Sequence, residues 1–435
     1  MGFGATGMLL HWLYWMVLVF ALAPLAYYVL SLYCVAGYFR ELRKSHPKRP
    51  EFTPPVSILK PVRGLDHQAY ENFASYCRLD YPEYEIVFAL GDADDPAVAV
   101  IEKLQADFPD RSIRLVKNVP RLGTNSKVNS LCRLVQEAKY ELLVMSDSDV
   151  RVGPNYLREA AGPLANSEVG AVTSFCQCLS GGSIASDLDA LGMCLDSVPS
   201  ALVARKLEGN MQFAFGWTMA TTKRHLLEIG GWEAMANYHS DDFEFGNRIA
   251  RQGYRVELMS QPVLMVFPQE TAGQYFRHEL RWSIGLKNVR PAGYRGLFFT
   301  HGLPWALVAA AVAAGAGWPA LAAAHLLAYV ALRFGLAWTT GVWGLQDPET
   351  SKRLWLVPLR DAVSFIAWLG GFFSDTITWR GLVYRVQNGQ LFPIPGVLFG
   401  KKSVSDSAGG LSQVSAILPD KRQSYVRQVA APPED

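Results

Sequence analysis

The tripeptide Asp147-Ser148-Asp149 places two carboxylates two positions apart, directly after the mostly apolar run Glu141–Met145. Two such carboxylates can chelate one hard divalent cation, because Mg²⁺ and Mn²⁺ take oxygen ligands and keep positions open for phosphate oxygens. A cation held there would neutralise a diphosphate leaving group. A polar turn that caps the next helix could have the same sequence, so this pattern alone leaves both interpretations open.

A second acid cluster, Asp92, Asp94 and Asp95, follows the run Glu85–Leu90. A carboxylate at the end of a strand can accept hydrogen bonds from a base or a ribose. Asp95-Pro96 is also an ordinary helix start, with Asp as the N-cap and Pro at the first helical position. We therefore expect Asp95 to cap a helix and Asp92 to contact a ligand.

A third cluster, Ser240-Asp241-Asp242-Phe243-Glu244, precedes a predicted helix over Phe243–Arg251. Adjacent acids at a helix N-terminus can serve only as capping residues, since they favour the positive end of the helix dipole. One of them could instead be a general base that takes a proton from an acceptor hydroxyl. The sequence favours neither interpretation.

Basic and aromatic residues accompany these acids. In His278-Glu279-Leu280-Arg281-Trp282, the Arg–Trp pair could anchor at a membrane interface, or could offer donors to a diphosphate or an acceptor hydroxyl. Gly64 would allow a ligand close to the backbone, whereas Lys60 could be a solvated surface charge. Lys127, in Gly123–Lys127, opens a helix and could reach a phosphate, although the spacing is wrong for a P-loop.

The elements that must position these residues alternate between short apolar runs and helical patterns. Strands are predicted at Val56–Leu59, Glu85–Leu90, Ile113–Val116, Glu141–Met145 and Gly170–Ser174, and helices at Pro96–Phe108 and Lys127–Ala138. Such alternation predicts an α/β fold with a mostly parallel twisted sheet and helices on both faces. Ligands of such sheets bind at the carboxyl ends of the strands, where two acid clusters lie.

Composition narrows the class of protein. The chain has 435 residues and a formal net charge of +2, is half apolar, and only 18% of it is charged, against about 25% in soluble domains. A disordered chain is excluded, since it would need low hydrophobicity and high net charge. No basic excess is present to neutralise phosphates, which argues against nucleic acid as a partner. The six cysteines form no C-x-x-C motif and are expected to be reduced, buried thiols.

The apolar excess lies at both ends. Residues 8–39 contain no charged residue and exceed the roughly 20 needed for a membrane span, so we expect a transmembrane anchor rather than a cleaved signal peptide. The basic linker 40–55 follows, and the positive-inside rule places it and the domain 56–296 in the cytosol. Residues 297–345 should form two spans, with the lone charge Arg333 facing protein.

Residues 354–374 form a further apolar block, interrupted by Arg360-Asp361, which we interpret as a re-entrant or interfacial segment. A cytosolic tail should follow over 375–435, disordered from about Ser403. Within the domain, Ile184–Phe215 is apolar at helical spacing. It could be core or a membrane-facing helix over which a lipid enters.

Several segments, in order, resemble motifs of glycosyltransferase family 21, the family of the ceramide glucosyltransferases, and more broadly of GT-A fold glycosyltransferases of family 2. The segments are the opening strand and loop Val56–Asp66, the first aspartate motif Asp92–Ala97, the Gly-x-x-x-Lys-x-Asn segment Gly123–Asn129, the second and third aspartates Asp147 and Asp242, and the end of a (Gln/Arg)-x-x-Arg-Trp motif at Arg281-Trp282. The similarity covers about Val56 to Asn288.

The resemblance implies a role for each matched residue. Asp92 would contact the uridine of a UDP-sugar, Asp147 and Asp149 would bind a metal–diphosphate through Mg²⁺ or Mn²⁺, and Asp242 would be the base of an inverting displacement. The remaining assignments are Lys60, Gly64, Asp94, Lys127, Arg281 and Trp282 to the donor site, and Trp217, Asp241 and His278 to the acceptor site.

The implied reaction is transfer of glucose from UDP-glucose to the hydroxyl of ceramide, a membrane lipid, at the cytosolic face. His278 stands where the motif has Gln or Arg, and Asp149 stands where animal ceramide enzymes have Gly. Both departures point to a bacterial branch and an inner-membrane location. They leave open a different acceptor, a hopanoid polyol, which would receive a hexose or N-acetylhexosamine from a UDP-sugar. A processive polysaccharide synthase would need more spans, and an inactive scaffold would not need three intact acid clusters.

Overall fold

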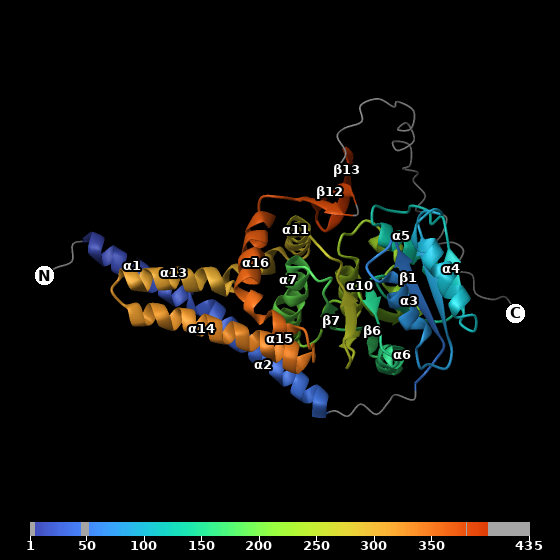
Figure 1. Ribbon diagram of the computed structural model, residues 1–435, viewed down its shortest axis with the longest axis horizontal. Coiled ribbons are helices and arrows are strands. Elements are labelled where there is room, and N and C mark those ends of the chain that lie inside the picture. Colours follow the sequence, from blue (N-terminus) through green and yellow to red (C-terminus); the bar gives the residue numbers. More distant parts are fainter. Residues whose placement is uncertain (1–4, 45–51, 380, 399–435) are drawn as a thin grey trace.

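The computed structural model describes residues 5–44, 52–379 and 381–398. A sheet domain lies at one end of the molecule, and the long helices α1 (Ala5–Phe20), α2 (Leu22–Lys44), α13 (Gly302–Gly315) and α14 (Pro319–Ala337) extend from it together (Figure 1). The predicted disordered tail from Ser403 lies outside the described residues, as do residues 45–51 of the predicted linker.

The main sheet has seven strands in the order β3-β2-β1-β4-β8-β6-β9. They are β1 (Val56–Val62), β2 (Tyr84–Leu90), β3 (Ile113–Val116), β4 (Leu142–Met145), β6 (Val169–Thr173), β8 (Met219–Thr222) and β9 (Arg255–Leu258). Within this sheet, β8 alone runs against its neighbours. The prediction of a mostly parallel α/β sheet is confirmed, and so are its five predicted strands.

Alternating residues of the central strands pack against helices on both faces of the sheet. Ile58 of β1 packs in one cluster with α3 (Ala69–Cys77) and α4 (Ala97–Asp107), whereas Leu59 packs in another with α5 (Ser126–Glu137). Complete burial of such a side chain stabilises the fold by about 1.5–3 kcal/mol. Both faces are therefore covered, and ligands must approach from the ends of the strands.

The cluster that contains Leu59 also joins the sheet domain to the long apolar helices. It contains Tyr28 and Val35 of α2 together with Leu202 of α8 (Val198–Glu208). Leu188 and Leu191 of α7 (Ile184–Gly192) lie in a further cluster with Val357 of the C-terminal segment. The apolar residues of 184–215 named here are therefore core, although their packing partners include the long apolar helices.

The other elements complete the frame around the strand ends. They are β5 (Val150–Arg151), α6 (Tyr156–Ala161), β7 (Cys176–Leu179), α9 (Lys223–Glu228), α10 (Asp241–Arg251), β10 (Val263–Val266), α11 (Ala272–Val289), α12 (Pro291–Gly296), α15 (Thr350–Arg353) and α16 (Val357–Gly371). Strands β5, β10 and β7 form a small second sheet that begins directly after Asp149. All six cysteines are free and buried, as predicted.

Three helical segments are long and apolar enough to cross a membrane: Tyr14–Lys44, Pro291–Gly315 and Pro319–Gly344. The first continues five residues beyond the predicted end of the anchor and includes the basic residues Arg40, Arg43 and Lys44. Arg333 is buried and pairs with Asp361 and Asp196, each at 2.7 Å. It thus faces protein, as predicted.

The segment that follows α16 contains strands that were not predicted from the sequence. It forms a three-stranded antiparallel sheet of β11 (Thr376–Trp379), β12 (Leu382–Gln387) and β13 (Gln390–Leu398). Asn388 and Gly389 both have positive φ, as a two-residue type I′ hairpin requires. The His239 N–H donates to the Gly389 carbonyl at 2.8 Å, so the hairpin lies against the loop before Asp242.

Candidate active site

A cavity of about 1380 Å³ runs from the carboxyl ends of the main-sheet strands to the membrane helices. Asp92, Asp147 and Asp242 line its strand end, and Tyr28 and Arg333 line the end among the membrane helices. Residues from the three acid clusters thus share one space. A ligand at the aspartates could be continuous with one held between the long helices.

Lys127 joins two of these clusters. Its Nζ lies 2.7 Å from Asp147 Oδ1 and 3.3 Å from Asp241 Oδ2. Asn125 caps helix α5, since its side chain accepts from the N–H groups of Lys127 and Val128, and this fixes the lysine at the first turn. Burial alone would lower the pKa of Lys127, but the surrounding carboxylates raise it above its ordinary value. A permanently charged ammonium therefore stands beside Asp147.

Asp149 is buried close to the carboxylates of Asp147 and Asp66. Its Oδ1 is buried and has no hydrogen-bond partner among the described residues. Burial first, and then the nearby carboxylates of Asp147 and Asp66, raise the pKa of Asp149 to about 7. An unpartnered carboxylate oxygen beside two further acids fits a divalent cation, because the ion supplies the missing positive charge. The residue set at Asp147 and Asp149 is therefore suited to the predicted Mg²⁺ or Mn²⁺.

Lys60 lies behind this loop. It is fully buried, its Nζ donates to the backbone carbonyl of Asp147, and it stands 4.1 Å from the ring centroid of Tyr76. Burial lowers the pKa of Lys60 to about 7. The side chain is outside the cavity lining, so Lys60 orders the Asp147 loop and does not face the space assigned to a donor.

The three aspartates of the first acid cluster have different surroundings. Asp95 Oδ1 accepts from Ala97 N at 2.9 Å, and its Oδ2 accepts from Gly64 N at 2.8 Å. The predicted capping role of Asp95 is confirmed, and Gly64, at φ +73°, is held by it. Asp92 lines the cavity, whereas the exposed Asp94 is outside its lining.

Asp242 sits at the start of α10 with two backbone donors. Its Oδ2 accepts from Gly216 N at 3.0 Å and its Oδ1 accepts from Phe243 N at 2.8 Å. Burial first, and then the adjacent Asp241, raise the pKa of Asp242 to about 6. A carboxylate with this pKa is ionised at neutral pH and is a stronger base than an ordinary aspartate.

Gly216 marks the point where the clusters converge. A Cβ at this position would lie 2.9 Å from Lys127 Nζ, 3.1 Å from Asp147 Oδ2 and 3.4 Å from Asp242 Oδ2. Only a residue without a side chain leaves this space free. Gly216 was not among the residues predicted from the sequence, although its position next to the predicted Trp217 was an available signal.

The remaining predicted residues form the cavity wall. Arg281 and Trp282 of α11 line it, and Trp217 lines it while stacking on Phe215 at 4.4 Å between ring centroids. Asp241 also lines the cavity. The Asp241 carboxylate is already engaged by Lys127 and by the amide of Asn125 at 3.3 Å, so it supports the site more than it faces an acceptor.

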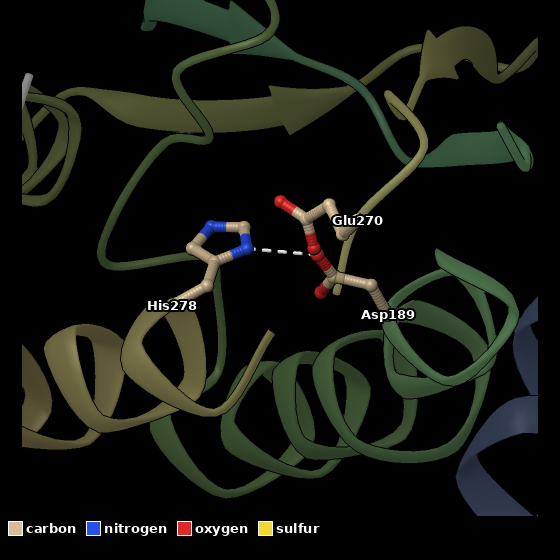
Figure 2. A group of neighbouring side chains, drawn as sticks. All are labelled: Asp189, Glu270 and His278. Carbon is tan, nitrogen blue, oxygen red and sulfur yellow. Dashed lines mark hydrogen bonds and ion pairs between the residues drawn. The ribbon is translucent and has the colours of Figure 1, made fainter. Parts of the chain in front are cut away.

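His278 has partners that the sequence analysis missed. Its Nδ1 lies 2.7 Å from Asp189 Oδ2 of α7, and Glu270 lies beside them (Figure 2). The His278 ring meets Trp282 edge-on at 4.9 Å between centroids. An acid on the buried face of the apolar helix at 184–192 was the signal that could have singled out Asp189.

A comparison with family models assigns the chain to a family. The model of "Glycosyl transferase family 21" matches residues 16–392. Because the match covers most of the sequence, the chain belongs to glycosyl transferase family 21. The predicted family, enzyme class and α/β transferase fold are confirmed.

Similar curated proteins carry the names of particular enzymes. "Ceramide glucosyltransferase 3" of Caenorhabditis elegans is 26% identical over 265 residues, which are 58% of this chain and 55% of that protein. "Ceramide glucosyltransferase" of Komagataella phaffii is 30% identical over 149 residues, 32% of this chain and 29% of that protein. The chain thus spans about half the length, or less, of these relatives.

A comparison with solved structures found two glycosyltransferases with low overall similarity to this chain. The mannosyltransferase PcManGT from Pyrobaculum calidifontis, in complex with GDP-Man and Mn²⁺, is 18% identical with a TM-score of 0.42, covering 80% of this chain and 99% of that one. GalNAc-T7 with UDP, GalNAc and Mn²⁺ is 13% identical with a TM-score of 0.39, covering 55% of this chain and 51% of that one.

Proposed function

We propose that the chain is an inverting glycosyltransferase that moves glucose from UDP-glucose to the hydroxyl of ceramide at the cytosolic face of a membrane. The observation that carries this proposal is the single cavity that joins the strand-end aspartates to the long apolar helices. A water-soluble acceptor would not need such a path. Membership of family 21, and relatives named ceramide glucosyltransferase, support the choice of lipid.

The donor would lie at the strand end of the cavity. Asp92 and the charged Lys127 both line the cavity, and they would contact the uridine and the diphosphate, respectively. Asp147 and Asp149 would hold Mg²⁺ or Mn²⁺, which when bound neutralises diphosphate charge. Arg281 would add a guanidinium, whose fork of donors suits phosphate oxygens.

Asp242 would act on the acceptor. It takes the proton of the acceptor hydroxyl onto a carboxylate oxygen while the hydroxyl oxygen forms a bond to the anomeric carbon. The bond from that carbon to the diphosphate oxygen breaks at the same time, and UDP leaves with its electron pair. Gly216 lies between Asp242, Asp147 and Lys127, and its lack of a side chain lets these groups converge around the proposed reaction centre. No covalent intermediate with the protein is required, so the configuration at the anomeric carbon inverts.

The orientation in the membrane follows from charge. Arg40, Arg43 and Lys44 end the first apolar helix and favour a cytosolic position for the domain that follows. With three helices long enough to span, the protein would be multi-pass, and α16 would be re-entrant or interfacial. Location of the protein in a bacterial inner membrane remains a prediction from the sequence.

The test is a product analysis. Detergent-purified protein is incubated with UDP-glucose, Mg²⁺ or Mn²⁺, and ceramide or a hopanoid polyol in separate reactions, and the lipids are read by mass spectrometry. Hexosylceramide with the β configuration, from the α-linked donor, is the expected product. A glycosylated hopanoid with unchanged ceramide would show that the acceptor is a hopanoid polyol, and the proposed transfer reaction would still hold. Transfer to neither would refute the proposal.

A further inference from the structure

Three side chains that the proposed reaction does not use for proton transfer or donor binding gather beside the main site. Asp189 of α7, Glu270 before α11 and His278 of α11 each point one ligand atom toward the others, and these atoms lie within 4.8 Å of one another (Figure 2). Glu270 and His278 line the cavity, and Asp189 is buried behind them at 1% exposure. Two carboxylates and an imidazole form a mixed oxygen and nitrogen donor set.

The cluster contains two buried carboxylate oxygens that lack hydrogen-bond partners among the described residues. Asp189 Oδ2 pairs with His278 Nδ1, but Asp189 Oδ1 and Glu270 Oε2 are buried without partners in the part of the chain that the structure describes. A buried polar oxygen without a partner destabilises the fold, so buried oxygens normally have a hydrogen-bond donor or a cation beside them. Burial and the facing Asp189 carboxylate raise the pKa of Glu270, as expected for two acids in one small space. A cation between them would satisfy both oxygens.

The three ligands are held by rigid elements. The Glu270 N–H donates to Ser183 Oγ at 3.2 Å, and Ser183 caps helix α7. A Cβ at Gly181 would lie 2.3 Å from the backbone nitrogen of Gln269, so the loop before α11 packs directly on the start of α7. Thr271 then caps α11. Preorganised side chains of this kind characterise built metal sites.

We propose that Asp189, Glu270 and His278 bind one divalent transition-metal ion, Zn²⁺ or Mn²⁺, distinct from the cation at Asp147 and Asp149. A site with an imidazole nitrogen suits these ions better than Mg²⁺, which prefers oxygen ligands alone. Three protein ligands leave at least one coordination position open, on the side where Glu270 and His278 line the cavity. The ion links α7 to α11 and holds the His278 ring against Trp282.

The experiment removes the other cation site first. The full-length variant Asp147→Ala/Asp149→Ala is stripped with a chelator, dialysed against Zn²⁺ or Mn²⁺, and assayed for bound metal by mass spectrometry and for thermal stability. We expect it to keep one ion per chain and to gain melting temperature when metal is added. Adding His278→Ala or Asp189→Asn should weaken binding at least about tenfold and abolish the thermal shift.

A matched control separates ligand loss from a general loss of charge. Glu168 is an exposed acid whose pairing distance to Arg255 is 3.8 Å, so Glu168→Gln in the same background should leave metal binding unchanged. Asp189→Asn keeps the side-chain size and a hydrogen-bond acceptor for His278, so the metal-free fold should survive. The proposal is overturned if the Asp147→Ala/Asp149→Ala variant binds neither ion, or if it binds equally well after His278→Ala.

Discussion

Replacing Asp242 by Asn tests the assigned base with little change in shape. The wild-type pKa is raised from 3.8 to about 6, and this shift of about two units corresponds to roughly 3 kcal/mol against the ionised form in the folded protein. The penalty is fully present above pH 6 and is relieved as the pH falls below it. The Asn variant should therefore be no less stable than the wild type at neutral pH, despite losing one backbone hydrogen bond worth about 1 kcal/mol.

The catalytic cost should be much larger. A positioned general base contributes about 10²–10⁴-fold, or roughly 2.7–5.5 kcal/mol of barrier. We expect kcat for Asp242→Asn to fall by that factor, with the UDP-glucose dissociation constant little changed, because the base acts on the acceptor. In the wild type, kcat/KM should fall tenfold per unit as the pH drops below about 6, since the base is then protonated.

The assay is hexosylceramide formation across pH, with UDP-glucose binding measured by calorimetry. Glu244→Gln is the matched control, because Glu244 lies on the same helix and pairs with Arg248 at 3.2 Å. Near-normal turnover of Asp242→Asn, or a wild-type profile that stays flat through pH 6, would refute the assignment. A comparable loss in Glu244→Gln would show that any charge change on α10 is harmful.

Three further variants probe the site and its support. Asp147→Ala should lose both the metal response and UDP-glucose binding in calorimetry; unchanged metal dependence would move the cation site elsewhere. Gly216→Ala should weaken donor binding with an unchanged melting temperature, because its Cβ would lie 3.1 Å from Asp147 Oδ2; Gly153→Ala, with open space around it, is the control. Arg333→Leu leaves Asp361 buried without its cation and should destabilise the protein by about 3–5 kcal/mol in denaturant titrations; if Arg333→Leu/Asp361→Leu recovers none of this, the pair is not the cause.

The sequence located the strand-end acids because that inference needs only local pattern. Apolar runs such as Glu85–Leu90 end in acids, and parallel strands bring their carboxyl ends to one edge. Asp95 could be assigned as a cap for the same reason, since the Asp-Pro helix start is contained in adjacent residues. These inferences required no knowledge of how distant segments pack.

What the sequence did not reveal depends on such packing. From the sequence, Lys60 could be a surface charge. In the structure, β1 lies between β2 and β4, and the Lys60 side chain is fully buried. Asp189 meets His278 only because α7 packs against α11. The hairpin at Asn388-Gly389 is different, because the Asn-Gly turn signal is present in the sequence itself. It was not predicted because the basic residues around it favoured a cytosolic tail.

In the proposed function, a lipid acceptor reaches Asp242 through the cavity between the sheet domain and the long apolar helices. Photo-crosslinking tests it most directly, with a ceramide that carries a photoreactive group near its polar end, added to Asp242→Asn with UDP-glucose and Mn²⁺. We expect labels at cavity residues such as Tyr28, Leu195 and Leu303, and we expect unlabelled ceramide to displace them. Labels confined to Leu307 and Leu327, which are 54% and 69% exposed, and not displaced by ceramide, would contradict it.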